Sequence, residues 1–327
     1  MMRLSPPLNY RLIQADNLDI TFGGGEANVA ASLARLGLPA EHVTCFPDNE
    51  LGRAAANHLR QYGVSMASTV FGGDRLGLYF LESGASVRAS KIVYDRADSA
   101  FAQLQPDWFD WETILAGAAW FHWTGITPAI SASAAAACAE AIQTARRLGV
   151  TVSADVNYRR NLWQYGRTAQ DVMPDLVAGC DVVVCAENDA EDLFGIQPNR
   201  YSADSFTDMA AHLMDRFPTI RQVITTRRET LSASHNRLHG LLYDRNADRF
   251  QTLTYDVVPI VDRIGGGDAF MAGFIYGSLT YETAEKALGC GVAASVLKHS
   301  IHGDINLATV TEIEALMAGN TSGRLLR

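Results

Sequence analysis

Residues Asp262 to Gly273 read DRIGGGDAFMAG: three glycines stand directly before an acid, Asp268, and the segment after the acid is almost entirely apolar. A helix that is apolar on every side is a buried one, so we expect a buried helix after Asp268. The first turn of such a helix has unpaired N–H groups and a partial positive charge. Preceding glycines let the backbone approach a ligand closely. The stretch therefore predicts an anion cradle suited to a phosphate, with a carboxylate fixed beside it.

A second glycine run, near the start of the chain, opens another predicted helix. The residues GGGEANVA span 23–30, and apolar residues recur at helical spacing over 26–37. Asn28 lies one turn into this helix, where it could face a ligand resting on the glycines. Each run alone is also compatible with a plain turn followed by a helix cap. Neither has the GxGxxG spacing of a dinucleotide site, and the chain contains no GxxxxGK[ST] phosphate loop.

Most of the remaining chain alternates between apolar strand patterns and helical patterns, and this alternation predicts an α/β fold. Continuous apolar strands separated by helices indicate a doubly wound, mostly parallel sheet covered on both faces. Ligands bind such sheets at the carboxyl ends of the strands. Strands are predicted at 43–47, 118–126, 151–157, 181–188 and 222–228, with a long alanine-rich helix at 129–149. Polar residues at the strand ends are Asp155, Asn157, Glu187, Asn188 and Thr225 to Arg228.

The pattern changes between Ser68 and Arg96. Two short strand-like runs, GLYFLES at 77–83 and SKIVYDR at 90–96, are separated by glycine, serine and charged residues. Such a pair predicts an antiparallel hairpin rather than a strand–helix unit. We expect it to stand off the main sheet as a small β lid.

Composition limits the classes of partner. The net charge of -9 and the pI near 5.4 argue against a nucleic-acid-binding surface, so an anionic substrate would need local arginines. The five cysteines show no CxxC spacing, which favours free buried thiols in a reducing cytoplasm. No cleavable leader and no apolar run of about 18 residues is present, so we expect a soluble cytoplasmic protein without a membrane partner.

Taken together and in this order, the two glycine motifs resemble the paired signatures of the ribokinase-like (PfkB) family of carbohydrate kinases. The family's N-terminal GGxxxN is matched by Gly23, Gly24 and Asn28. Its C-terminal DTxGAGD is matched by Asp262, Gly265, Gly267 and Asp268, with Arg263 and Gly266 as substitutions. The resemblance spans almost the whole chain.

This resemblance implies a single ribokinase-like kinase domain over 1–327, with lid strands contributed by about 8–22 and 68–98. It implies transfer of a phosphoryl group from ATP to a sugar hydroxyl. The matching acid of the family is the catalytic base and the matching glycine N–H groups form the anion hole. Asp268 is thereby assigned as the base, and Gly265, Gly266 and Gly267 as the anion hole.

Two arginines indicate the class of sugar. Arg96 ends the second lid strand, and Arg159 follows a predicted strand of the main sheet. A guanidinium binds a carboxylate through two parallel hydrogen bonds, so this pair favours a sugar acid over a neutral pentose. Either arginine alone could equally be a solvated surface residue.

Several further stretches resemble the 2-keto-3-deoxygluconate kinases of the family, among them GLYFLE, DVNYRRNLW and DRIGGGDAF. That resemblance implies phosphorylation of the terminal, 6-hydroxyl of 2-keto-3-deoxygluconate. The two tyrosines of the lid could instead be aromatic residues that only pack it. The substrate contacts implied are Gly24, Asn28, Tyr79, Tyr94, Arg96, Ile126, Arg159 and Asp268.

The resemblance also implies the nucleotide side of the site. The family's NxxE is matched by Asn188 and Glu191, of which Glu191 would organise Mg²⁺ through water, since Mg²⁺ tends to keep its own waters. Arg227 is expected near the phosphates. Asp262 is a candidate for holding a monovalent cation such as K⁺, which some relatives use. No cluster of histidines or cysteines suggests a transition metal.

The sequence departs from the family pattern at three places. Relatives begin with a strand ending in Gly-Glu or Gly-Asp before a segment like MRLSPP, so that first strand is expected to be missing here. The segment 225–236 lacks the glycines usual in the nucleotide loop, which leaves the adenine contacts unassigned. Asp95 stands beside Arg96, where close relatives often have a second aromatic residue, and an acid there could pair with Arg96 and weaken carboxylate recognition.

Other functions remain open from the sequence alone. Within the class, the substrate could be fructose or 2-keto-3-deoxygalactonate, because one inverted hydroxyl leaves no trace in a single sequence. Outside it, the chain could be a sugar-acid sensor that binds without turnover. Apolar faces on a β lid favour pairing between subunits, so we expect a homo-oligomer formed through the lid.

Overall fold

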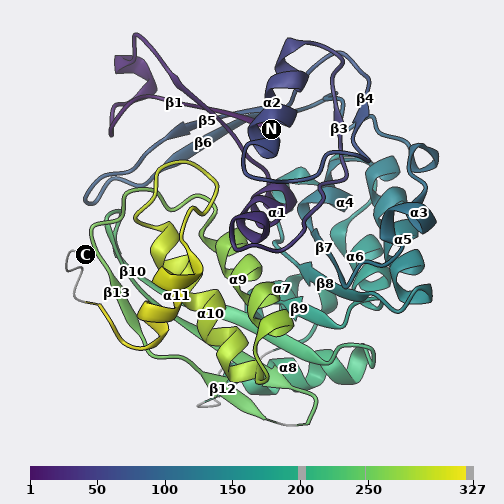
Figure 1. Ribbon diagram of the computed structural model, residues 1–327, viewed down its shortest axis with the longest axis vertical. Helices are drawn as coiled ribbons and strands as arrows, with labels where there is room; N and C mark the ends of the chain where they lie inside the picture. Colours follow the sequence, from purple (N-terminus) through teal and green to yellow (C-terminus); the bar gives the residue numbers. More distant parts are fainter. Residues whose placement is uncertain (198–203, 247, 322–327) are drawn as a thin grey trace.

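A computed structural model of the protein describes residues 1–197, 204–246 and 248–321 (Figure 1). The helices are α1 (Gly25–Arg35), α2 (Glu50–Arg60), α3 (Trp111–Leu115), α4 (Ile126–Ile130), α5 (Ala132–Arg147), α6 (Ala169–Val177), α7 (Glu187–Phe194), α8 (Ser205–Arg216), α9 (Gly266–Thr280), α10 (Ala284–Lys298) and α11 (Val310–Met317). The strands are β1 (Met2–Ser5), β2 (Asp19–Phe22), β3 (Cys45–Phe46), β4 (Val70–Phe71), β5 (Leu78–Glu82), β6 (Lys91–Asp95), β7 (Trp120–Thr124), β8 (Thr151–Asp155), β9 (Val182–Val184), β10 (Gln222–Ser232), β11 (His235–Asp244), β12 (Arg249–Gln251) and β13 (Tyr255–Val257).

The main sheet has the strand order β12-β11-β10-β9-β8-β7, and β13 pairs with β11. Strands β7 to β10 are parallel to one another, whereas β11 is antiparallel to β10, β12 and β13. The predicted α/β fold with a mostly parallel sheet is therefore confirmed. Strands β3 and β4 form a separate parallel pair, and β7 lies at one edge of the main sheet.

Helices cover both faces of the main sheet. Successive side chains of a strand point to opposite faces, so each strand contributes to the core on both sides. Val183 and Val223 pack in the core formed with α5, α6 and α8. Their neighbours Val182 and Ile224 pack in a second core with α9 and α10. Burial on both faces explains why these strands are continuously apolar in the sequence.

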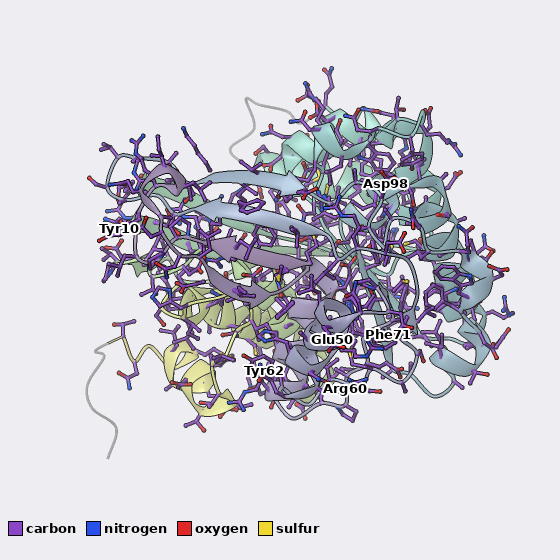
Figure 2. All side chains as sticks on the ribbon, turned by 90° about the horizontal axis from the view of Figure 1, so that it is seen from above. Tyr10, Glu50, Arg60, Tyr62, Phe71 and Asp98 are labelled. Carbon is purple, nitrogen blue, oxygen red and sulfur yellow. The ribbon has the colours of Figure 1, made fainter. Side chains whose placement is uncertain are left out.

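The lid is a four-stranded sheet with the order β2-β1-β5-β6. The predicted antiparallel hairpin is present as β5 and β6. Two corrections follow: β1 also belongs to the lid although it precedes the predicted range 8–22, and β1 is parallel to β5. The lid is mixed because β1 and β5 are joined by a long connection through α1 and α2. Figure 2, seen from above, shows the strands side by side, with Tyr10 at the opposite end of the view from Phe71 and Asp98.

Helix α9 follows the glycine run and is buried as predicted, with Phe270 and Phe274 at the core. Close contact with α10 requires small residues: a Cβ on Gly273 would lie 2.7 Å from the carbonyl oxygen of Cys290. The positive end of α9 is thus held by a tightly packed pair of helices. The five cysteines are free and buried.

Two predicted segments differ in the structure. The predicted helix at 129–149 begins at Ala132, because Ser131 caps α5 by accepting from the N–H of Ala134. The predicted strand at 222–228 is longer than expected: β10 continues through the glycine-free segment to Ser232 before turning into β11. Without glycines to break it, the β-branched and polar run continues as a hairpin. Within the described residues no helix is both long and apolar enough to span a membrane.

Candidate active site

A cavity of about 640 Å³ is lined by residues of the lid, of the starts of α1 and α9, of the carboxyl ends of β8 and β9, and of the middle of β10. The structure brings together at this cavity predicted site residues as distant in the chain as Gly24 and Asp268. The predicted site residues that line it are Gly24, Asn28, Tyr79, Tyr94, Arg96, Ile126, Arg159, Gly265, Gly266, Gly267 and Asp268. Those that do not line it are Asn188, Glu191, Arg227 and Asp262.

Asp268 stands in the first turn of α9 and is held by the other glycine motif. Its Oδ2 accepts a hydrogen bond of 2.6 Å from Nδ2 of Asn28, whose Oδ1 accepts from the N–H of Gly24 at 3.3 Å. Burial raises the pKa of Asp268 to about 8, opposed by the Asn28 hydrogen bond and assisted by the nearby carboxylates of Asp155 and Asp304. The carboxyl is therefore positioned rigidly and is a stronger base than an ordinary aspartate.

The glycine run forms the cavity wall next to Asp268. Gly265 adopts a left-handed conformation with φ +79°, and a Cβ there would lie 1.9 Å from the carbonyl oxygen of Asp304. Only glycine fits this position. The N–H of Gly266 makes a long 3.4 Å contact with the carbonyl of Arg263. All three glycines thus lie at the positive end of α9, where an anion is favoured.

Arg96, which follows lid strand β6, and Arg159, which follows β8 of the main sheet, both line the cavity. Burial lowers the pKa of Arg96, and the positive charge of Arg159 lowers it further. The guanidinium of Arg96 lies over the ring of Tyr94, 4.4 Å from its centroid, and its buried Nε has no hydrogen-bond partner. The predicted pair of Asp95 with Arg96 is wrong: Asp95 accepts from Arg75 at 2.6 Å, because alternate strand residues face opposite sides of the lid.

Tyr79 lies beside Tyr94 but has a different role in the structure. Its side chain is 7% exposed, and its hydroxyl donates to the carboxylate of Asp304. Burial, followed by the charge of Asp304, raises the pKa of Tyr79. The ring of Tyr79 therefore borders the cavity while its hydroxyl is already paired.

Four acids that line the cavity were not among the predicted site residues: Glu26, Asp155, Asp189 and Asp304. Asp155 ends β8 and Asp189 lies in the first turn of α7. Burial raises the pKa of Asp155 to about 7, assisted by the charge of Asp189, and burial raises that of Asp189 to about 6. The position of Asp155 at a strand end was the signal that could have identified it, whereas nothing in the sequence singled out Asp189.

The residues predicted for the nucleotide lie beyond the cavity lining. Arg227 forms an ion pair with Glu187, at the start of α7. Asn188 is exposed and Glu191 is partly buried on the same helix. These three therefore remain predictions.

Asp262 belongs to a buried cluster of charges behind the glycine run. Arg3 Nη1 lies 2.7 Å from Asp262 Oδ2 and 2.9 Å from Asp304 Oδ1. Asp262 also accepts from the N–H groups of Ile264 and Gly303. Sequence reasoning missed Arg3 and Asp304, because their positions 301 residues apart give no sign that they meet.

The chain shows extensive similarity to known proteins. The family model described as pfkB family carbohydrate kinase matches residues 3–310. The curated 2-dehydro-3-deoxygalactonokinase of Haloferax volcanii is 34% identical over 323 residues, which are 99% of this chain and 96% of that protein. The solved structure of 2-dehydro-3-deoxygluconokinase from Thermotoga maritima is 42% identical, with a TM-score of 0.93, and the match covers 98% of this chain and 97% of that chain. That of a PfkB family carbohydrate kinase from Listeria grayi is 36% identical, with a TM-score of 0.90 and 97% of both chains covered.

Proposed function

Because the chain belongs to the pfkB family of carbohydrate kinases, we propose that it transfers the terminal phosphoryl group of ATP to the 6-hydroxyl of 2-keto-3-deoxygluconate. In this proposal the whole chain, 1–327, acts as one kinase domain. The observation that carries the sugar-acid assignment is that Arg96 and Arg159 both line the cavity, where the charge of Arg159 lowers the pKa of Arg96.

Two neighbouring guanidinium groups repel each other unless an anion lies between them. A carboxylate can accept parallel hydrogen bonds from each, including from the unpaired buried Nε of Arg96. A neutral sugar could offer that nitrogen only an uncharged oxygen, and a hydrogen bond between two charged groups contributes more free energy. The carboxylate end of the substrate is therefore placed at Arg96 and Arg159, and its other end reaches toward Asp268.

At the other end of the cavity, Asp268 accepts the proton of the attacking hydroxyl. The N–H groups of the glycine run stabilise the charge that develops on the transferred phosphoryl, an electrostatic contribution of about 3 kcal/mol per donor. The cavity carboxylates of Asp155 and Asp189 suit Mg²⁺, which prefers oxygen ligands and its own waters. Glu191 remains the candidate for a water-mediated contact. When bound, Mg²⁺ would neutralise phosphate charge.

The relatives differ over the configuration of the substrate. The match from Haloferax volcanii is named for the galacto sugar and that from Thermotoga maritima for the gluco sugar. We propose the gluco substrate, in line with the higher identity, and keep 2-keto-3-deoxygalactonate as the alternative. The test is a screen of the purified protein against both sugar acids, fructose and ribose, with ADP release as the readout. A preference for fructose or ribose would contradict the sugar-acid assignment.

Replacing Arg159 by methionine is expected to raise the KM for the sugar acid roughly 10- to 150-fold, because one charged hydrogen-bonding partner contributes about 1.5–3 kcal/mol. The KM for ATP should not change. The matched control is Arg160→Met, since Arg160 is the neighbouring, exposed arginine and pairs with Asp192 instead. Steady-state kinetics with each substrate varied would decide. An equal rise in KM for fructose and for the sugar acid would argue against carboxylate recognition.

We further propose that the protein dimerises through the outer face of the lid. The strand registers place Ile20, Leu4, Phe80 and Val93 in one row across all four strands. Ile20 is 58% and Val93 is 55% exposed, which leaves an apolar row open to solvent. A partner of the same kind would cover it and remove the exposed surface.

Changing both Ile20 and Val93 to glutamate is expected to convert the dimer to a monomer, because charges would be buried without partners. Light scattering coupled to size-exclusion chromatography measures the mass directly. Val87→Glu is the control, since Val87 is 96% exposed at the tip of the hairpin and outside the row. A wild-type protein that runs as a monomer, or a doubly substituted protein that remains a dimer, would refute this interface.

A further inference from the structure

Lys298, the last residue of α10, is a fully buried cation immediately behind the glycine run. Its Nζ donates a hydrogen bond of 2.8 Å to the carbonyl of Ile301. A Cβ atom added to Gly265 would lie 3.4 Å from Cε of Lys298, so the lysine side chain packs directly beneath that glycine. Burying an ammonium group is costly unless it is compensated, so its presence here requires an explanation.

The compensation comes from two carboxylates. Asp262 and Asp304 both favour the charged form of Lys298, against burial and the charge of Arg3, and burial keeps the pKa of the lysine below its usual value. Arg3 contacts the same two carboxylates directly. The cluster therefore holds two positive and two negative side chains. It is neutral without any added ion.

The oxygens of this cluster, the carbonyl of Ile301 and the carboxylates of Asp262 and Asp304, are of the kind that bind metal cations. Carboxylate and carbonyl oxygens are the ligands that hard cations take from proteins. Here the ammonium takes the carbonyl oxygen of Ile301, and Arg3 takes an oxygen of each carboxylate. A monovalent cation bound to Asp262 would have to lie beside the positive charges of both Arg3 and Lys298. The residues around Asp262 therefore do not fit a further cation.

We propose that Lys298 supplies the positive charge behind the anion hole that a bound monovalent cation would otherwise supply, so that phosphoryl transfer requires no K⁺. Lys298 acts through the Asp262–Gly265 loop, which makes it a positioning residue rather than one that touches substrate. This inference rests on the proposed function, because kcat can be measured only if the protein phosphorylates the sugar acid. A second measurement, the Tm, does not depend on turnover.

The experiment compares KCl with choline chloride at equal ionic strength, for the wild type and for Lys298→Ala. Two quantities are measured, kcat with the sugar acid and the Tm. The wild type is expected to give the same kcat and the same Tm in both salts. Lys298→Ala should lose roughly 10- to 100-fold in kcat in choline chloride, because the charge behind the anion hole is gone.

In the variant, KCl, ammonium or methylammonium should restore kcat and raise the Tm, since a cation that binds only the folded protein stabilises it. The matched control is Lys286→Met, on the exposed side of the same helix, which should resemble the wild type in both salts. If Lys298→Ala does not fold, Lys298→Arg should fold and remain active in choline chloride, because it keeps the charge.

Activation or thermal stabilisation of the wild type by KCl relative to choline would overturn the proposal. So would a folded Lys298→Ala whose kcat is unchanged, or whose loss none of the three cations repairs, because the lysine would then be structural only. If no sugar acid is phosphorylated by the wild type, the proposed function fails. The comparison of Tm values would still decide whether Lys298 occupies the place of a cation.

Discussion

Replacing Asp268 by asparagine is expected to lower kcat roughly 10²- to 10⁴-fold, the contribution of a positioned general base, while the affinity for the sugar acid stays the same. Asparagine has the same shape, and its side-chain oxygen can still accept the hydrogen bond that Asn28 now donates at 2.6 Å. The cavity wall should therefore be unchanged. Only the ability to take a proton is lost.

The measurements are ADP release and calorimetric binding of the sugar acid. Asp175→Asn, at an exposed position of α6, is the control for the same chemical change away from the cavity. A variant at position 268 that keeps more than about a tenth of the wild-type kcat would show that the base is another group. A wild type that binds the sugar acid but releases no ADP would favour a sensor instead of an enzyme.

The raised pKa of Asp268 also predicts how activity and stability depend on pH. The base must be ionised, so kcat/KM should rise as the pH increases through about 8. Stability should change in the opposite direction. Between the ordinary pKa of 3.8 and about 8 the folded protein holds a proton that the unfolded chain has lost, so rising pH favours unfolding. Asp155 and Asp189, whose pKa values are also raised, contribute in the same direction at lower pH. Asp268→Asn should therefore weaken the trend, most of all between pH 7 and 8, which thermal unfolding from pH 5 to 9 can measure.

The second large effect is expected from Gly265→Ala. The added methyl carbon would lie 1.9 Å from the carbonyl oxygen of Asp304, and the backbone has φ +79°. The glycine run must therefore move away from its present position. Loss of one correctly placed N–H donor should lower kcat roughly 10²- to 10³-fold, with some loss of stability.

Gly289→Ala is the matched control for Gly265→Ala, because a Cβ on Gly289 meets only the flexible end of Met317 at an ordinary 3.4 Å. It should leave kcat unchanged. Circular dichroism and the Tm separate a displaced loop from a protein that has not folded. A folded Gly265→Ala protein with the wild-type kcat would mean that this glycine run does not stabilise the transferred phosphoryl.

Local features of the sequence predicted a large part of this site. The glycine runs, Asp268 and Asn28 lie where the chain turns into a helix, and a turn of this kind can be read over a few residues. Arg159 could be found because it follows a strand of the main sheet, and ligands bind where the carboxyl ends of such strands meet. Arg96 could be found because it ends a strand of the predicted lid. These local patterns predicted both the fold class and many of the residues that line the cavity.

What the sequence did not predict depends on contacts between distant segments. Arg3 meets Asp304 only because β1 joins the lid beside β5, and no periodicity reveals which strands will pair. The partner of Asp95 depends on the face of β6 from which it projects, which is set by register. The segment 225–236 lacks the glycines of a loop, and only the structure shows it as a continuous strand and hairpin.

The buried cluster also determines how the lid can move. At one end, Arg3 of β1 is bound to Asp262 and Asp304, and separating such a buried pair costs several kcal/mol. At the far end, the hairpin tip is joined to the β10–β11 turn by a hydrogen bond from the N–H of Ala233 to the carbonyl of Ser86, worth about 1 kcal/mol. The lid should therefore pivot about the Arg3 ion pairs and open when the hydrogen bond between Ala233 and Ser86 breaks. The rate of product departure would then be set by the breaking of that hydrogen bond, far from the chemistry.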